Sequence, residues 1–166
     1  MHHVPDDVKM TIGRALGRVP SGVFILTAMH DGKPLAMMAS WVQQVAFAPP
    51  SVSVAIAKER PAHGALSAVP GTTFALSVVP DGDTSLMKKY ARGIPADADP
   101  FEGVNITRTA NGTIVLADAL AYLECRVSKR VEFNGDHDLF IAEVVAGQML
   151  KDGASFMHLR GNGFHY

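Results

Sequence analysis

AMMASWVQQVAFAPPSVSVAIAKER, residues 36–60, is the stretch that decides the fold of this chain. It begins as a strand, is interrupted by polar residues, turns at Pro49-Pro50 and continues as an apolar strand over 51–57. A strand that bends before such a corner frees backbone N–H and C=O groups to bind a ligand instead of a neighbouring strand. Because Lys58-Glu59-Arg60 follows directly, the segment predicts both a piece of β-sheet and a ligand site.

Short apolar runs separated by turn residues continue on both sides of this stretch. Asp31-Gly32 supplies the positive-φ residues of a hairpin turn. Several short strands without strand–helix–strand alternation predict a mainly β protein, built as a closed or half-open antiparallel barrel. Closure would also remove most exposed strand edges. The predicted strands are 22–29, 34–42, 51–57, 72–79, 117–133 and 138–150.

Two segments have helical patterns. Over 6–19 the apolar residues recur at helical spacing and form one stripe, as in an amphipathic helix. A shorter helix is expected over 83–92, with Asp83 or Thr84 as its cap. Residues 93–103 are irregular and read as an exposed loop or lid. The members of the first stripe are Val8, Ile12, Ala15, Leu16 and Val19.

Composition limits the possible functions. The 166 residues are 48% hydrophobic and 19% charged, which predicts one globular domain, 1–166. Lys and Arg number 15 against 16 Asp and Glu, with no basic stripe, so neither nucleic acid nor an anionic membrane is an expected partner. The start of the chain lacks a signal-sequence pattern, and no run approaches the roughly 18 apolar residues of a membrane span. We therefore expect a cytoplasmic protein, with room for a dimer interface.

Ser40 and its neighbours are the first candidate site. They can be ordinary strand residues whose polar members face solvent. Alternatively they bind a ligand, because polar residues interrupt an apolar run just where the strand must bend. The residues concerned are Met38, Ala39, Ser40, Gln43 and Gln44.

Lys58 and Arg60 end a buried strand. Such a pair can simply be a solvated strand end. It can also be a phosphate clamp, in which Lys acts as a point charge and Arg as a planar fork. His63 lies just beyond and is able to join such a clamp.

Asp136-His137-Asp138 looks like a catalytic dyad or a metal site, although an Asp- and Gly-rich turn is the simpler interpretation. A metal would need two or three more ligands, and His158 and His165 lie on another segment without a recognised spacing, so no metal is expected. His137 is plausible as a polar group beside a bound cofactor, since neutral imidazole both donates and accepts. Cys125 alternates with apolar residues, which predicts a buried and inert thiol.

The ordered motifs resemble the flavin reductase-like family, whose fold is an FMN-binding split β-barrel. They are Ser21-Gly22-Val23, the Asp-Gly turn, ASWVQQVAFAPPSVSVAIAK, LADALAYLECRV, GDHDLFIAEVVAG and the closing RGNGFHY. The resemblance runs from about Arg18 to Tyr166. Within the family, SWVQQVAF, AKER and ADALAYLECRV are most similar to the flavin reductase domain appended to cyanobacterial flavodiiron proteins.

This resemblance implies an antiparallel split β-barrel of Greek-key type with an N-terminal helix and one or two short helices. It also implies FMN, or FAD, at a homodimer interface, with NAD(P)H as co-substrate. Met37 to Gln44 would line the isoalloxazine and ribityl chain, Lys58 with Arg60 would hold phosphate, and His137 would lie near flavin or nicotinamide. The expected cofactor-binding residues are Met37, Met38, Ala39, Ser40, Trp41, Gln43, Gln44, Lys58, Arg60 and His63; the expected catalytic residue is His137.

The loop departs from the family pattern, because Ser40 is its one remaining hydroxyl where relatives carry several. Three functions remain open. The first is NAD(P)H-dependent flavin reduction, with hydride passing from nicotinamide C4 to flavin N5. The second is an electron-transfer module that holds FMN for a partner protein. The third is a non-redox binder of another flat ligand such as haem, with His158 or His165 as its ligand.

Overall fold

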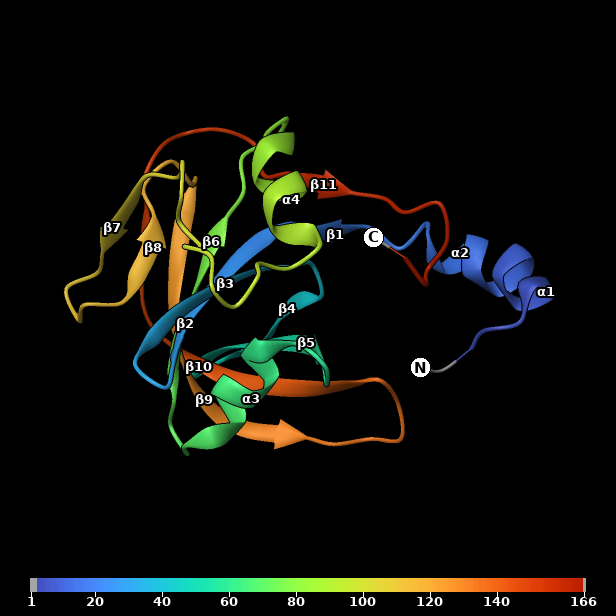
Figure 1. Ribbon diagram of the computed structural model, residues 1–166, viewed down its shortest axis with the longest axis horizontal. Helices are drawn as coiled ribbons and strands as arrows, with labels where there is room; N and C mark the ends of the chain where they lie inside the picture. Colours follow the sequence, from blue (N-terminus) through green and yellow to red (C-terminus); the bar gives the residue numbers. More distant parts are fainter. Residues whose placement is uncertain (1–2, 166) are drawn as a thin grey trace.

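The computed structural model describes residues 3–165, and its centre is a seven-stranded antiparallel sheet (Figure 1). The strand order is β3-β2-β6-β9-β10-β5-β4. Their bounds are β2 Phe24–His30, β3 Lys33–Ala39, β4 Val42–Phe47, β5 Pro50–Ala57, β6 Thr73–Val78, β9 Ala121–Val131 and β10 His137–Met149. The predicted mainly β, antiparallel split-barrel fold is confirmed.

The two edge strands of the sheet, β3 and β4, follow one another in the chain. Only Ser40 and Trp41 separate them. A sheet whose opposite edges are joined by two residues has to curl into a barrel, and because β3 and β4 do not pair, the barrel is split at this link. The sequence predicted a polar kink after the first strand of the opening stretch. The part of this kink from Val42 onward is instead a regular strand, β4, with a register shift between Gln44 and Ala46.

The barrel interior is apolar and closed at one end by a helix. Leu26, Val54, Phe74 and Phe140 are fully buried there. Helix α3 (Pro61–Ala68) contributes Ala62 and Leu66 to the same cluster, among others. This helix was not expected from the sequence; Pro61 at its first turn starts it, since proline needs no hydrogen-bond acceptor there.

A second apolar cluster lies under α4 (Thr84–Ala91) and the hairpin of β7 (Ile106–Arg108) and β8 (Ile114–Leu116). The expected helix over 83–92 is confirmed, and the Asp83 side chain caps it by accepting from the Leu86 N–H at 3.3 Å. Residues 93–103 are irregular as expected. They are not wholly exposed: Phe101 is buried in this cluster, the buried Tyr90 hydroxyl donates to the Pro100 carbonyl at 2.7 Å, and Lys89 donates to the Glu102 carbonyl at 2.8 Å.

A helical arm projects from the barrel beside the end of the chain (Figure 1). It consists of α1 (Asp6–Val8), a π-helical turn η1 (Lys9–Gly13) and α2 (Arg14–Leu16), so it ends earlier than expected. The strands β1 (Ser21–Gly22) and β11 (Met157–His158) pair at its base. The expected apolar stripe does not face the core of its own chain: Ile12 is 58% and Leu16 43% exposed, whereas Gly13 and Gly17 are buried.

No helix within residues 3–165 has both the length and the apolar character needed to cross a membrane.

Candidate functional site

Trp41 and His137 lie together at the split of the barrel. Trp41 follows the edge strand β3, and its carbonyl accepts from the Ala55 N–H at 3.0 Å. His137 begins β10 and pairs with Ala57 of the same β5 strand. Their ring centres are 4.8 Å apart, with the planes tilted by 46°. The structure therefore brings together two residues predicted from distant parts of the sequence.

The orientation of His137 is fixed by its sequence neighbour. Its Nδ1 lies 2.8 Å from Oδ1 of Asp136. Because a carboxylate only accepts when ionised, this contact places the Nδ1 proton on the histidine and leaves Nε2 as the nitrogen for a ligand.

The residues before Trp41 contribute mainly through their backbone. Met38 and Ala39 are buried in the core, and Met37 is half-buried against the barrel interior. Ser40 is 1% exposed, and its Oγ has no hydrogen-bond partner within the described part of the chain. Since β3 is an edge strand, outward-facing backbone groups near Ala39 and Ser40 have no strand to pair with.

Gln43 and Gln44 lie on β4 and are exposed. Gln44 Nε2 donates to the Ala46 carbonyl at 3.4 Å. They stand one strand outward from β5, so they flank the Trp41–His137 pair along the sheet edge rather than beneath it.

Lys58 and His63 meet on a buried carboxylate. His63 Nε2 lies 2.8 Å from Asp138 Oδ2, and Lys58 Nζ lies 3.5 Å from Asp138 Oδ1. Lys58 also donates to the Phe133 carbonyl at 3.2 Å. The hydrogen bond from His63 is the largest influence on Asp138 and, with the Lys58 charge, it lowers the pKa of that carboxyl against the opposing effect of burial. The Lys58 ammonium is thus held against Asp138, whose side chain points to the opposite face of β10 from its neighbour His137.

Arg60 points elsewhere. Its Nη2 donates to the Ala91 carbonyl at the end of α4, at 3.1 Å. The structure therefore does not bring Lys58 and Arg60 together as one clamp; each holds a different element.

Arg160 and His158 lie beside the pair but were not predicted as flavin-site residues. The Arg160 guanidinium carbon is 5.6 Å from the centre of the Trp41 ring. His158 pairs with Ser21 across β1 and β11. Burial, followed by the Arg160 charge, lowers the pKa of His158, so its imidazole is neutral near pH 7. The only available signal was the closing RGNGFHY, which gives no indication of burial.

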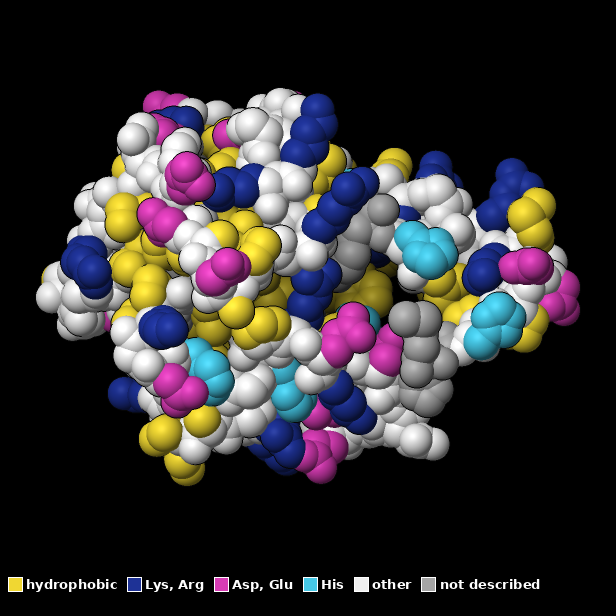
Figure 2. Space-filling view, viewed as in Figure 1, with side chains coloured by type: hydrophobic (Ala, Val, Ile, Leu, Met, Phe, Trp, Pro, Cys, Tyr) yellow, Lys and Arg dark blue, Asp and Glu magenta, His cyan; other side chains and the backbone are white. Residues whose placement is uncertain are grey.

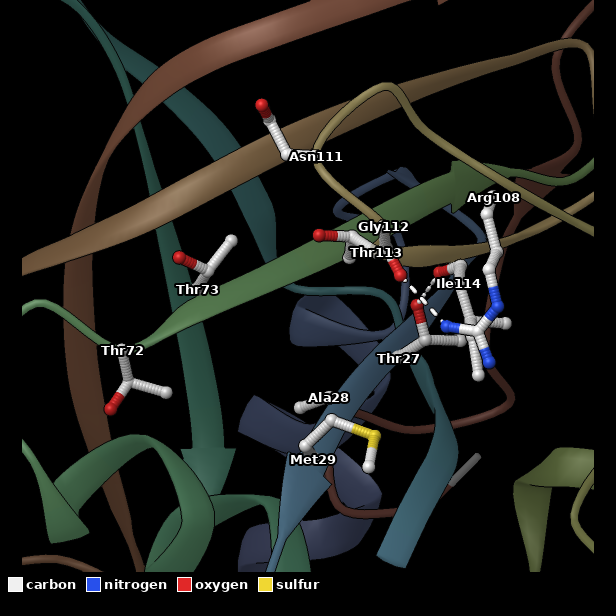
Figure 3. A pocket seen from close by; sticks show the side chains of 10 residues that line it. All are labelled: Thr27, Ala28, Met29, Thr72, Thr73, Arg108, Asn111, Gly112, Thr113 and Ile114. Carbon is white, nitrogen blue, oxygen red and sulfur yellow. Dashed lines mark hydrogen bonds between the residues drawn. The ribbon is translucent and has the colours of Figure 1, made fainter. Parts of the chain in front are cut away.

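A cavity lies elsewhere, between β2, the start of β6 and the β7–β8 hairpin (Figure 3). It measures about 360 Å³, and Thr27, Thr73, Arg108 and Thr113 are among its lining residues. None of the predicted site residues lines it. Within residues 3–165 no group of three or more His, Cys, Asp or Glu side chains is arranged to hold a metal.

The cysteine is buried, as predicted. Burial, together with the charge of Glu124, raises the pKa of the Cys125 thiol to about 12. A thiol with that pKa carries almost no thiolate at neutral pH, so it takes no part in the site.

The family model described as "Flavin reductase like domain" matches residues 16–164. The chain is 38% identical to "Diflavin flavoprotein A 1" of Synechocystis sp. (strain ATCC 27184 / PCC 6803 / Kazusa), over 92% of this chain and 26% of that protein. It thus spans about a quarter of the length of the curated relatives it matches.

Solved structures show the same similarity. The chain is similar to "Streptomyces globisporus C-1027 NADH:FAD oxidoreductase SgcE6", with a TM-score of 0.82 and 28% identity over 97% of this chain and 93% of that one. A second structure of that protein, "in complex with NAD and FAD fragments", gives a TM-score of 0.80 and 27% identity, over 98% and 94% of the two chains.

Proposed function

The chain belongs to the family of flavin reductase like domains, and from this premise we propose that it is an NAD(P)H-dependent flavin oxidoreductase that binds FMN. The single observation that carries the proposal is the Trp41–His137 pair at the split of the barrel, with the Arg160 guanidinium over the Trp41 ring. The similarity to a structure described as an NADH:FAD oxidoreductase supports the reaction class.

The residues at the split suit a flavin nucleotide. A flat ring needs an aromatic or apolar wall, and Trp41 supplies one. The polar edge of that ring needs donors, which the unpaired backbone near Ala39 and the partnerless Ser40 hydroxyl can supply. A phosphate needs a cation, and Lys58 stands fixed between Asp138 and Phe133.

A bound flavin supplies the hydride acceptor, N5, and the protein supplies distance and polarity. The side chains then have distinct roles. Trp41 stacks and excludes water. Backbone N–H groups at Ala39 and Ser40 stabilise negative charge on the ring edge. His137, oriented by Asp136, presents Nε2 to the nicotinamide, to position it or to hold a proton.

We also propose that the protein is a homodimer with the flavin at the interface. Two groups of exposed apolar side chains support this. One is the stripe of the helical arm, and apolar side chains reach the surface of this arm in Figure 2. The other is on the edge strand β4, where Phe47 is 91% exposed. A second copy would cover these surfaces and close the split.

The absorption spectrum of the purified protein tests the proposal. After incubation with FMN and removal of the free ligand, the protein is expected to be yellow, and its band near roughly 450 nm should bleach on addition of NADH or NADPH. A colourless protein that retains no FMN and consumes no NAD(P)H contradicts the proposal.

A second candidate function is electron transfer to a partner protein. It is favoured by the length of the relatives, in which the matching domain is part of a chain about four times longer. In that case FMN stays bound, and steady-state NAD(P)H oxidation does not rise when free FMN is added as second substrate. A rate that saturates with added FMN favours the reductase instead.

A further inference from the structure

Arg160 is a buried cation beside the Trp41–His137 pair. It is 6% exposed, and its Nη1 donates to the Ser21 hydroxyl at 3.3 Å. Its Nε has no hydrogen-bond partner, and the guanidinium forms no ion pair with a carboxylate, within residues 3–165.

Two other arginines of the chain show the opposite arrangement. Arg126 and Arg130 are more exposed, yet each pairs with a glutamate, Glu143 and Glu132 respectively. Burying an unpaired charge costs several kcal/mol, whereas an exposed ion pair contributes little. An arginine that is both buried and unpaired therefore indicates a counter-charge that comes from outside the described chain.

The neighbours of Arg160 suit an anion. Burial and the Arg160 charge keep His158 neutral, and its Nε2, like the Arg160 Nε, is buried without a hydrogen-bond partner among residues 3–165. Arg18 approaches from the arm, where its Nη2 donates to the Arg160 carbonyl. These groups are cationic or neutral, and both unpartnered groups can donate a hydrogen bond.

We propose that Arg160 binds a phosphate group of a nucleotide cofactor, with His158 as a further donor. This inference rests on the proposed function. Arg160 lies over Trp41, whereas Lys58 is held by Asp138, whose side chain points to the opposite face of β10 from His137. The planar fork of arginine matches phosphate, so lysine is not equivalent at this position.

Ligands that differ in a phosphate test the inference. Riboflavin and FMN differ by one phosphate, and ADP-ribose carries the pyrophosphate of NADH without its nicotinamide. Binding of all three would be measured by calorimetry for wild type, R160Q, R160K and the exposed control R126Q. R160Q should weaken binding of the phosphate-bearing ligand about 10- to 100-fold, and it should leave riboflavin affinity and the secondary structure unchanged. The affinity of R160K for the phosphate-bearing ligand should lie between those of wild type and R160Q.

The set of ligands whose binding R160Q weakens identifies the nucleotide that supplies the phosphate. Loss confined to FMN assigns Arg160 to the flavin, and loss confined to ADP-ribose assigns it to the nicotinamide nucleotide. Equal weakening of riboflavin and FMN overturns the inference, because Arg160 then only supports Trp41; unchanged affinities for all three ligands overturn it as well. A wild type that binds no flavin at all, riboflavin included, contradicts the proposed function itself.

If R160Q does not fold, an NMR measurement on the wild-type protein still tests the inference. The NMR signal of the Arg160 Nε–H group, assigned by its absence in R160K, should shift on titration with inorganic pyrophosphate. A signal that stays in place contradicts the inference.

Discussion

At the residue scale, His137 has the most specific role in the proposed reaction. Replacing it by Gln keeps a polar side chain but removes the imidazole that Asp136 orients. We expect the rate of flavin reduction by NAD(P)H to fall about 10- to 100-fold, because a positioned acid–base group contributes roughly that much. The FMN affinity should change little. Stopped-flow absorbance measures the rate, and quenching of the single tryptophan, Trp41, measures FMN binding.

His30→Gln is the matched control, since His30 lies on the β2–β3 hairpin and contacts only Asp31 among the ion pairs described. An H137Q protein that reduces flavin at the wild-type rate would return His137 to the status of a turn residue.

Asp138 carries a prediction about pH. Its folded-state pKa is below the ordinary value, so between that pKa and the unfolded one the unfolded chain binds more protons. The free energy of unfolding should therefore fall as the pH drops through the folded-state pKa, and this contribution should be present above the unfolded value of about 4. In Asp138→Asn this part of the acid dependence should disappear, with lower stability at neutral pH.

Urea unfolding of both proteins from acid to neutral pH measures the effect. Asp152→Asn removes a carboxylate from an exposed position and serves as control. Parallel curves for wild type and D138N would mean that the contacts with His63 and Lys58 do not stabilise the fold.

At the candidate site, the sequence predicted the Trp41–His137 pair better than the cations around it. Trp41 was named through the resemblance to the flavin reductase-like family, and His137 through the GDH turn together with that resemblance. The clamp of Lys58 and Arg60 was read from sequence proximity, but one turn of chain sends the two side chains to different partners. Arg160 was missed because nothing local to a Gly-rich tail indicates burial.

At the element scale, the helical arm depends on glycine for its contact with the tail. A Cβ on Gly17 would lie 2.6 Å from the Arg160 carbonyl oxygen, which is backbone and cannot move aside cheaply. We expect Gly17→Ala to lower the free energy of unfolding by about 1–3 kcal/mol, as overpacking does, despite the better helix propensity of alanine.

Gly64→Ala is the matched control in α3. The nearest atom to its Cβ would be on His30 at 3.9 Å, an ordinary contact, so the substitution should stabilise by up to about 1 kcal/mol. Urea denaturation measures the free energy of unfolding of both variants. Equal changes in that free energy for the two substitutions would contradict the packing argument.

Two elements, α3 and β4, were not predicted from the sequence, because each has a weak local pattern. The α3 segment, PAHGALSA, is short and contains Gly64, so its helical period is weak; its packing on the barrel interior stabilises it. VQQVAF, residues 42–47 of the opening stretch, looked like a kink because polar residues interrupt it. It is the edge strand β4, on which Gln43 and Gln44 are both exposed.

At the scale of the whole molecule, the split barrel follows from one connection. Six of the seven strands of the sheet were predictable as short apolar runs with turns between them, but their order was not, since strand pairing depends on contacts between distant segments. The link Ser40–Trp41 joins the two sheet edges. It therefore decides both that the sheet curls and where its unpaired backbone lies, which is why the stretch that carries the fold also carries the site.

The exposed stripe on the arm leads to a prediction about assembly. Ile12 is 58% exposed, and Leu16 is 43% exposed although it lies against Gly163 of the tail; a side of a helix that is apolar and exposed is usually covered by a partner. We expect wild type to sediment at twice the chain mass of 17.7 kDa, and Ile12→Glu with Leu16→Glu to sediment as a monomer. FMN affinity should fall in the monomer, because the proposed site lies at the interface.

Val69→Glu, on an exposed apolar residue after α3, is the control and should remain dimeric. A wild type that is monomeric with and without FMN would rule out the proposed dimer, and a double variant that stays dimeric would place the interface elsewhere, at the edge strand β4 with Phe47.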